Sequence, residues 1–288
     1  MWYLRGLVCV LALGVMPILG CTDGDGTDLC EGVMCEDGGN ECTEDVCNPA
    51  DGTCGVPVEN GTVCSDGICL DGDCTETATV SGVVYFVETF GDDQPAPSAT
   101  VSVRGTSLST TTDEQGEFAF DVPIGYVFMQ SSQTDTWGLI DGWPVPQEGL
   151  TNAELIVVAD GLVAEWSQDI GRSIDETKGI VFPFFEAASG MGGETVELSE
   201  QYDFASTLDG NGDWVISNAL VEGGEDWLTF VGVELTEQLT VTPKGNEGET
   251  CYLADCWRGM CVPADPQTVY PVEAKFYTTF DIVCVSEQ

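Results

Sequence analysis

"TDEQGEFAFDV" (residues 112–122) has the two marks of a β-hairpin, a turn followed by an alternating strand. The side chain of Asp113 can accept hydrogen bonds from the backbone just beyond it, and Gly116 can take the positive φ that closes such a turn. After the turn, Phe118, Phe120 and Val122 alternate with Glu117, Ala119 and Asp121. This period of two predicts a strand with one buried face, and it favours a mainly β fold.

Segments on the N-terminal side of this hairpin extend the β pattern. "SGVVYFVETF" (residues 81–90) is rich in β-branched and aromatic residues, as strands are. The landmarks Ser81-Gly82-x-Val84, Pro97, Ala99-Thr100-Val101 and Thr112-Asp113-x-x-Gly116-x-Phe118 together resemble the carboxypeptidase regulatory-like domain, with Ser98 where that family usually has Gly. The resemblance implies a transthyretin-like β-sandwich over residues 77–159.

The same layout recurs about 96 residues later in the chain. Gly179-Ile180-Val181, Val196 with Leu198, and Asp209-x-x-Gly212-x-Trp214 repeat the landmarks Gly82-Val83-Val84, Val101 with Val103, and Asp113-x-x-Gly116-x-Phe118. Three landmarks in the same order predict a tandem duplication. We therefore expect a second transthyretin-like sandwich over residues 175–288.

One helix is predicted between the two sandwiches. Leu162, Val163, Trp166 and Ile170 follow helical spacing. We place this linking helix at residues 160–174, with Asp160 as its N-cap and Gly171 as its stop, and we expect Trp166 and Trp214 in the core. The predicted fold class is thus mainly β, with two tandem β-sandwiches, one short linking helix and a small disulfide-rich module before them.

Cysteines define that module. Of the fourteen cysteines, Cys9 and Cys21 lie near the N-terminus. The other twelve are Cys30, Cys35, Cys42, Cys47, Cys54, Cys64, Cys69 and Cys74, and Cys251, Cys256, Cys261 and Cys284. Because each group has an even number of cysteines, we expect every cysteine to pair in a disulfide, although the spacing does not determine which pairs form. The lack of histidine and of a Cys-x2-Cys pair disfavours a zinc site. Residues 30–76 hold too few large apolar side chains for a core, and they resemble the cysteine-rich repeats of bacterial cell-surface proteins.

The N-terminus has the anatomy of a secretory signal. The apolar run from Leu7 to Leu19 is shorter than the roughly 20 residues of a membrane span. Ile18-Leu19-Gly20-Cys21 resembles the lipobox of bacterial lipoproteins. The resemblance implies a signal peptide at residues 1–20, a Cys21 whose acyl chains bind the lipid bilayer, and an acidic tether at residues 21–29. Because Thr22 rather than Asp follows the cysteine, we expect the outer membrane, with the periplasmic or outer face left open.

Charge and composition exclude several functions. A net charge of −43 repels phosphates, so nucleic acid is not a partner. The absence of histidine excludes Ser-His-Asp and Cys-His nucleophilic sites. We therefore expect no enzyme, although a carboxylate pair could still support a hydrolase. The predicted function is structural presentation or binding outside the cell.

Two kinds of binding site are candidates. Trp137, Trp143 and Trp257 lie in Gly-, Pro- or Cys-rich loops, where exposed aromatic rings could stack on a polysaccharide; surface proteins are the other possible partners. Asp209, Asn211 and Asp213 have the spacing of calcium ligands. Trp214 and Leu220 occupy the positions where an EF-hand needs Gly and Glu, so a plain hairpin turn is the favoured interpretation, and we expect no cofactor.

Overall fold

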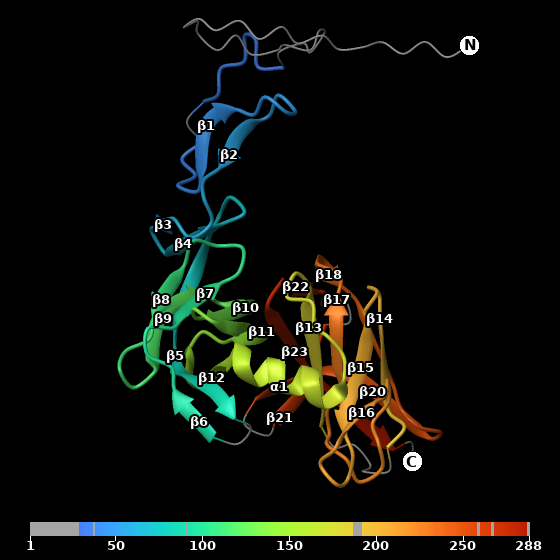
Figure 1. The fold of residues 1–288 in the computed structure, drawn as a ribbon. Coiled ribbons are helices and arrows are strands. Elements are labelled where there is room, and N and C mark those ends of the chain that lie inside the picture. Colours follow the sequence, from blue (N-terminus) through green and yellow to red (C-terminus); the bar gives the residue numbers. More distant parts are fainter. Residues whose placement is uncertain are drawn as a thin grey trace, which may run out of the picture.

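The computed structural model describes residues 29–36, 38–89, 92–186, 192–257, 260–265 and 268–286. It is mainly β with a single helix in the described part, as predicted (Figure 1). The predicted signal peptide, the predicted lipid attachment site at Cys21 and all of the predicted tether except Leu29 lie outside the described residues. We call residues 30–74 the stalk and residues 75–286 the body.

The elements follow one another along the chain as three groups. The stalk contains β1 (Thr43–Cys47), β2 (Cys54–Pro57), β3 (Val63–Cys64) and β4 (Gly67–Leu70). The next group is β5 (Asp73–Thr89), β6 (Asp92–Pro95), β7 (Thr100–Val103), β8 (Ser109–Thr111), β9 (Glu117–Pro123), β10 (Gly125–Ser132), β11 (Thr136–Val145), β12 (Leu150–Ala159) and α1 (Asp160–Ile170). The last is β13 (Gly179–Glu186), β14 (Thr195–Leu198), β15 (Phe204–Leu208), β16 (Trp214–Ile216), β17 (Thr229–Val233), β18 (Thr236–Leu239), β19 (Val241–Lys244), β20 (Glu249–Trp257), β21 (Met260–Pro263), β22 (Tyr270–Val272) and β23 (Phe276–Ser286).

The stalk is held by disulfides rather than by a core. Its bridges are Cys30–Cys47, Cys35–Cys54, Cys42–Cys69 and Cys64–Cys74. Among its described side chains, only Cys42, Ile68 and Cys69 are buried hydrophobics. Figure 1 shows the stalk as a narrow projection from the body. β5 pairs with β4 and then runs on into the body, so a continuous strand joins the two parts.

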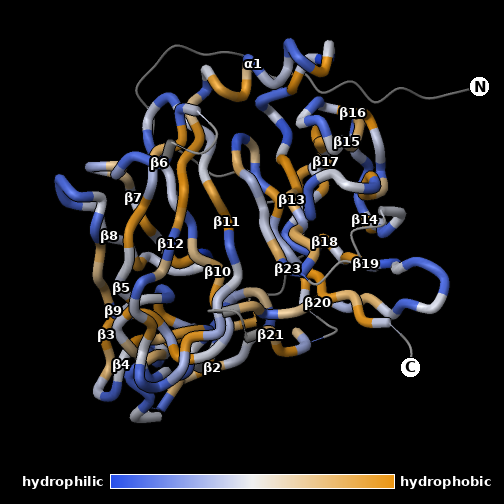
Figure 2. Tube along the Cα trace, turned by 90° about the horizontal axis from the view of Figure 1, so that it is seen from below, coloured by the Kyte–Doolittle hydropathy of each residue, from blue (hydrophilic) through white to orange (hydrophobic). Residues whose placement is uncertain are grey.

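The described part of the body has two main sheets, and the pairs β14–β19 and β18–β22 form two small ones. In the short sheet, β5 pairs in parallel with β12 on one edge and antiparallel with β9 and β6 on the other. The long sheet has the order β8-β7-β10-β11-β23-β13-β17-β15-β16. Figure 2 shows hydrophobic stretches along β11, β12 and β13 inside the body. The short sheet covers one end of the long sheet, and the first hydrophobic core lies between them.

β23 joins the two halves of the body into one sheet. Its residues Phe276–Thr279 pair in parallel with Gly138–Asp141 of β11, and its other edge pairs with β13. The two copies of the predicted duplication differ in how their strands pair. β9, which follows the Asp113 turn, pairs with β5, whereas β16, which follows the Asp209 turn, pairs with β15. β13 instead has β17 and β23 as neighbours, because the C-terminal strand returns to the centre of the sheet.

The middle of the long sheet is buried on both faces. Along β13, Val181 and Phe185 pack into a second core that β14, β18 and β22 also line. Phe182 and Phe184 alternate with them and point to the opposite face. In β23, Phe280 and Ile282 belong to the second core, and Tyr277 lies on the other side. This alternation carries the candidate site described below.

The helix begins where the sequence predicts it, but it ends at Ile170 rather than at residue 174, and its first turn differs from the prediction. α1 ends at Gly171, whose φ of 67° is left-handed, as expected for a glycine stop. Its N-cap is Ala159, without a side-chain cap, so the assignment of Asp160 as N-cap is wrong. Asp160 Oδ2 instead accepts a hydrogen bond of 2.8 Å from Lys275 Nζ, which ties the helix to the strand region before β23. Among the described residues, no helix is long and apolar enough to cross a membrane.

The second group of cysteines is also closed. Cys251–Cys284 links β20 to β23, and Cys256–Cys261 links β20 to β21. All twelve predicted cysteines therefore lie in disulfides. The first of these bridges fixes a hairpin onto the C-terminal strand, next to the carboxylates described below.

Candidate functional site

A cavity of about 410 Å³ opens where β11 and β12 separate. These strands pair only at Thr136–Trp137 with Val158–Ala159, after which β11 turns to β23 and β12 stays with β5. α1 follows β12 directly and lines one side of the cavity, and β13 and β16 also contribute to the lining. We call this space the aromatic cavity. Its volume lies within the usual range for small-molecule sites.

Aromatic rings in contact form one side of the cavity. Trp166 of α1 lies 5.0 Å from Trp214, centroid to centroid, and Trp214 lies 5.4 Å from Trp227. Trp227 stacks on Phe182 at 4.8 Å with an interplanar angle of 27°. Phe182 in turn contacts Phe184, which is 39% exposed. A continuous aromatic surface therefore runs from the helix to solvent.

Trp166 has an unusual environment for a buried tryptophan. It is only 4% exposed, yet its indole Nε1 donates a hydrogen bond to no acceptor within the described part of the chain. A buried tryptophan N–H usually has a partner. Trp214, expected in the core, is partly buried: it packs against the first core and also lines the cavity.

Together with the hydroxyl group of Tyr277, the polar side chains of Asp93, Asp141, Glu154 and Thr279 complete the lining of the cavity. Thr279 Oγ1 donates a hydrogen bond of 3.0 Å to Asp141 Oδ1. Solvent reaches part of Asp141, but its carboxyl group is desolvated, and this raises the pKa of Asp141 to about 7. The negative charge of Asp281 acts in the same direction, whereas the Thr279 hydrogen bond opposes it.

Asp141 also borders a second, smaller space of about 200 Å³, which we call the carboxylate hollow. Its acidic residues are Asp141, Glu154, Asp255 and Asp281. Desolvation, with the charges of Glu186 and Asp255, raises the pKa of Asp281 to about 6. Tyr126 hydrogen-bonds to Asp255, and burial raises the pKa of the Tyr126 hydroxyl. Carboxyl groups with raised pKa values in a cleft are the feature that a hydrolase would need.

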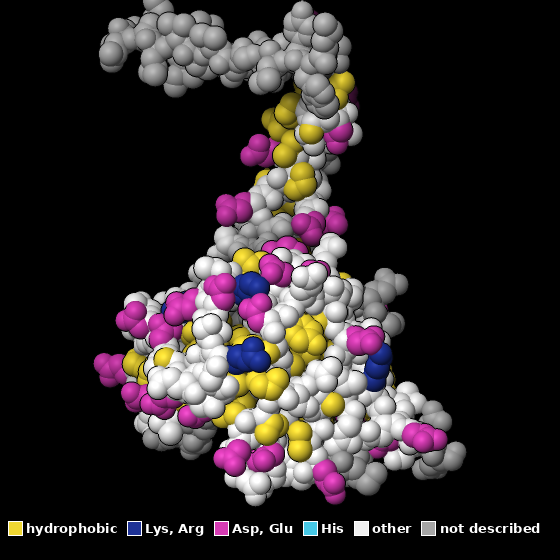
Figure 3. All heavy atoms as spheres, turned by 45° about the vertical axis from the view of Figure 1, so that its right-hand side comes forward, with side chains coloured by type: hydrophobic (Ala, Val, Ile, Leu, Met, Phe, Trp, Pro, Cys, Tyr) yellow, Lys and Arg dark blue, Asp and Glu magenta, His cyan; other side chains and the backbone are white. Residues whose placement is uncertain are grey.

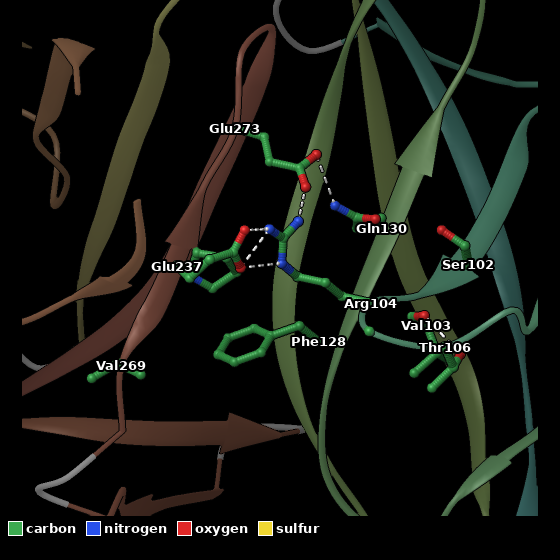
Figure 4. Close-up of a pocket in the computed structure, with 11 residues that line it drawn as sticks. Ser102, Val103, Arg104, Thr106, Phe128, Gln130, Glu237, Val269 and Glu273 are labelled. Atoms are coloured by element: carbon green, nitrogen blue, oxygen red, sulfur yellow. Dashed lines mark hydrogen bonds and ion pairs between the residues drawn. The ribbon is translucent and has the colours of Figure 1, made fainter. Parts of the chain in front are cut away.

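An ion-pair cluster around Arg104 lies elsewhere and is structural. Figure 4 shows Arg104, between β7 and β8, reaching Glu237 of β18 and Glu273 beyond β22. Arg104 Nη2 lies 2.6 Å from Glu237 Oε1, and Gln130 Nε2 lies 3.2 Å from Glu273 Oε2. A space of about 530 Å³ adjoins this cluster. Because two carboxylates already occupy the guanidinium group, it is poorly suited to bind an anion, and we assign it to joining the two halves of the body.

The tryptophans proposed for sugar binding do not form an exposed platform. Trp137 and Trp143 are 1% and 7% exposed. Trp137 packs edge-on against Tyr277 at 5.9 Å. Stacking on a sugar requires an accessible ring face. The prediction that Trp137 and Trp143 are exposed is therefore wrong, because both lie in the core. Trp257 lies in β20, but its side chain is outside the described residues.

The candidate calcium ligands form a hairpin turn. Asp209 Oδ1 accepts hydrogen bonds from the backbone N–H of Asn211 at 2.8 Å and of Asp213 at 3.1 Å. Asp113 makes the same pair of bonds, each 2.9 Å, to Gln115 and Glu117. Within the described residues, the only cluster with metal-ligand spacing consists of three sulfurs that lie in disulfides. The hairpin interpretation thus has a direct structural basis.

We expect Asp209→Ala to lower the Tm by roughly 2–4 °C, because two turn hydrogen bonds are lost. The shift should be the same with calcium and with a chelator, as measured by differential scanning calorimetry. Asp113→Ala is the matched control, since it removes the equivalent bonds from the turn between β8 and β9, which pair with β7 and β5 and do not form the expected hairpin. A Tm that calcium raises in the unaltered protein but not in Asp209→Ala would instead establish a calcium site.

No known protein family matches the chain, and no curated protein matches it. Loose matches occur among solved structures. The major pilin protein T-13 from Streptococcus pyogenes is 5% identical, with a TM-score of 0.22, over 74% of this chain and 98% of that one. The shaft pilin SpaA from Lactobacillus rhamnosus GG is 8% identical, with a TM-score of 0.22, over 74% of this chain and 99% of that one.

The TIE protein of Bacillus anthracis is 10% identical, with a TM-score of 0.21, over 81% of this chain but 40% of that one. These superpositions are too loose to transfer an activity, a ligand or an assembly. The resemblances to lipoproteins and to the carboxypeptidase regulatory-like domain stay predictions.

Sequence reasoning missed the residues that make the aromatic cavity. Asp141 and Asp281 each interrupt an apolar strand, "TWGLIDGWPV" and "FYTTFDIVCV". Burying a carboxylate in such a strand costs free energy unless the group has a hydrogen-bond or charge partner. An acidic residue inside an apolar strand is therefore the signal that could have identified Asp141 and Asp281. Phe182, Trp214 and Trp227 come from segments that only the fold brings together.

Proposed function

We propose that this chain is a non-catalytic, lipid-anchored protein of the outer membrane that presents its body outside the cytoplasm. The observation that supports this most directly is the stalk, whose four disulfides replace a hydrophobic core. Such bridges persist in oxidising compartments. Along the chain, the stalk lies between the proposed anchor at Cys21 and the body.

The surface supports a presenting role. Figure 3 shows acidic side chains spread over the stalk and the body, with few basic ones. Like charges keep such molecules apart and keep the body away from anionic headgroups. A stalk that ends in a continuous β-strand would hold the body at a distance from the bilayer as a stiff spacer.

Labelling with radioactive palmitate tests the anchor. We expect the unaltered chain to carry label and Cys21→Ser to lose it completely, because the thiol of Cys21 is the proposed acyl acceptor. Cys9→Ser is the matched control, since Cys9 lies in the proposed signal peptide, and its mature product should be labelled normally. Label that persists in Cys21→Ser would contradict the anchor. Protease treatment of whole cells then distinguishes the outer from the periplasmic face.

A hydrolase is the second candidate function, and the carboxylate hollow is the observation that favours it. A polysaccharide panel tests it together with the carbohydrate-binding alternative, for which Trp257 is the remaining candidate residue. Release of reducing ends that is lost in both Asp141→Asn and Asp281→Asn would replace the non-catalytic proposal. Binding without release, lost in Trp257→Ala, would make the protein a carbohydrate receptor.

A further inference from the structure

We propose that the aromatic cavity binds a small organic cation with an apolar body, such as an alkylated or quaternary amine. The cavity lies in the body, so this inference does not depend on the lipid anchor. It rests on the ring geometry, on the distribution of charge along the lining, and on the number of polar groups there.

The rings provide the first reason. Trp166, Trp214 and Trp227 lie on one side, and Phe182 and Phe184 continue the same surface. The faces of aromatic rings are electron-rich and attract cations, and tryptophan does so most strongly. A cation whose substituents are apolar can contact these rings without losing strong hydration. The aromatic side therefore suits both parts of such a ligand.

Charge provides the second reason. Asp141, Glu154 and Asp93 line the cavity, and Glu154 and Asp93 are exposed at its opening. None of the described residues on the lining is a lysine or an arginine. Carboxylates without a basic partner in an apolar setting attract a positive ligand more strongly than they would in water. An anionic ligand would meet repulsion both here and from the chain as a whole.

The scarcity of polar groups argues against a sugar. A sugar ring carries several hydroxyl groups, and each one buried without a partner costs free energy. Apart from the Tyr277 hydroxyl and the indole N–H groups, only Asp93, Asp141, Glu154 and Thr279 offer polar side-chain atoms on the lining, and the Thr279 hydroxyl already donates to Asp141. An organic cation needs few hydrogen bonds. The N–H of Trp166 could serve one acceptor atom on the ligand.

Titration of the full chain with benzyltrimethylammonium tests this inference. Cys21→Ser is used as the background so that neither lipid nor detergent contributes, and binding is followed by tryptophan fluorescence and calorimetry. We expect saturable binding with a Kd at or below about 1 mM. Neopentylbenzene, the neutral isostere of this probe, should bind at least about tenfold more weakly. Methyl glucoside should not bind.

Two variants locate the site. Trp227→Leu removes a ring but keeps apolar volume, and Asp141→Asn removes a charge but keeps shape; each should weaken cation binding about tenfold. Asp66→Asn, exposed in the stalk, is the control for lowering the chain's charge and should bind normally. Near-ultraviolet circular dichroism confirms that each variant is folded.

Three results would overturn the inference: no saturable binding, equal affinity for the neutral isostere, or cation binding that both cavity variants leave unchanged. If Trp227→Leu does not fold, the nearly isosteric Asp141→Asn still decides the question. Loss of palmitate labelling in Cys21→Ser has no bearing on this result, because that experiment tests the anchor alone.

Discussion

Replacing Cys42 and Cys69 with serine is expected to unfold the stalk and leave the body folded. The bridge closes a loop with a sequence separation of 27 residues, and removing it costs about 3–4 kcal/mol in the chain-entropy description. Its two sulfurs are also most of the buried hydrophobic material in the stalk, where Ile68 is the only other such side chain described. A segment of this size has little stability to lose. The body keeps both of its cores.

Thermolysin digestion followed by mass spectrometry measures this difference. In the double variant we expect rapid cuts next to stalk residues such as Val46 and Val56, and a resistant fragment that begins near β5. Cys256→Ser with Cys261→Ser is the matched control. That bridge spans 5 residues across one hairpin, so its loss should loosen β20 and β21 and leave the stalk resistant. A resistant stalk in the first variant would show that its turns and hairpins suffice without the central bridge.

Local features of this fold could be predicted because their causes are local. The Asp113 turn depends on one side chain and on the backbone of the next four residues, and its hydrogen bonds are as expected. The helix spans Asp160–Ile170 because its apolar residues recur at helical spacing and Gly171 ends it. The two cysteine groups were correctly predicted to be closed disulfide sets, because each group has an even number of cysteines and all of them can therefore pair within the group.

Long-range pairing could not be predicted in this way. Phe276–Thr279 of β23 pairs with Gly138–Asp141, more than a hundred residues earlier, and nothing in either segment specifies the other. The repeat of landmarks near Asp209 predicted the turn correctly but not the neighbours of the strand that follows it. The aromatic cavity results from that long-range pairing, because it lies where β11 leaves β12 to join β23.

Asp141→Asn is expected to stabilise the protein at pH 8 and to lose that advantage as the pH falls toward 4. The pKa of Asp141 is about 7 in the folded state, above the ordinary aspartate value of 3.8, because its carboxyl group is desolvated and faces Asp281. The folded state therefore binds a proton more tightly than the unfolded state does. Between these two pKa values, stability falls as the pH rises, and the full cost is present above pH 7. That cost is on the order of 2–4 kcal/mol.

The measurement is urea unfolding of the unaltered protein and of Asp141→Asn at several pH values. The difference between their free energies of unfolding cancels the contribution of every group that has the same pKa in both proteins. The other titratable groups around the hollow are Tyr126, Glu154, Asp255 and Asp281. Asp281→Asn should show the same trend, since the pKa of Asp281 is raised to about 6. Asp66→Asn again reports the general effect of removing one charge.

A variant that is less stable at pH 8 would mean that the ionised carboxylate has a stabilising partner. A stability gain at pH 8 combined with weaker cation binding would show that Asp141 is kept for a ligand, because evolution retains a destabilising buried charge where function requires it.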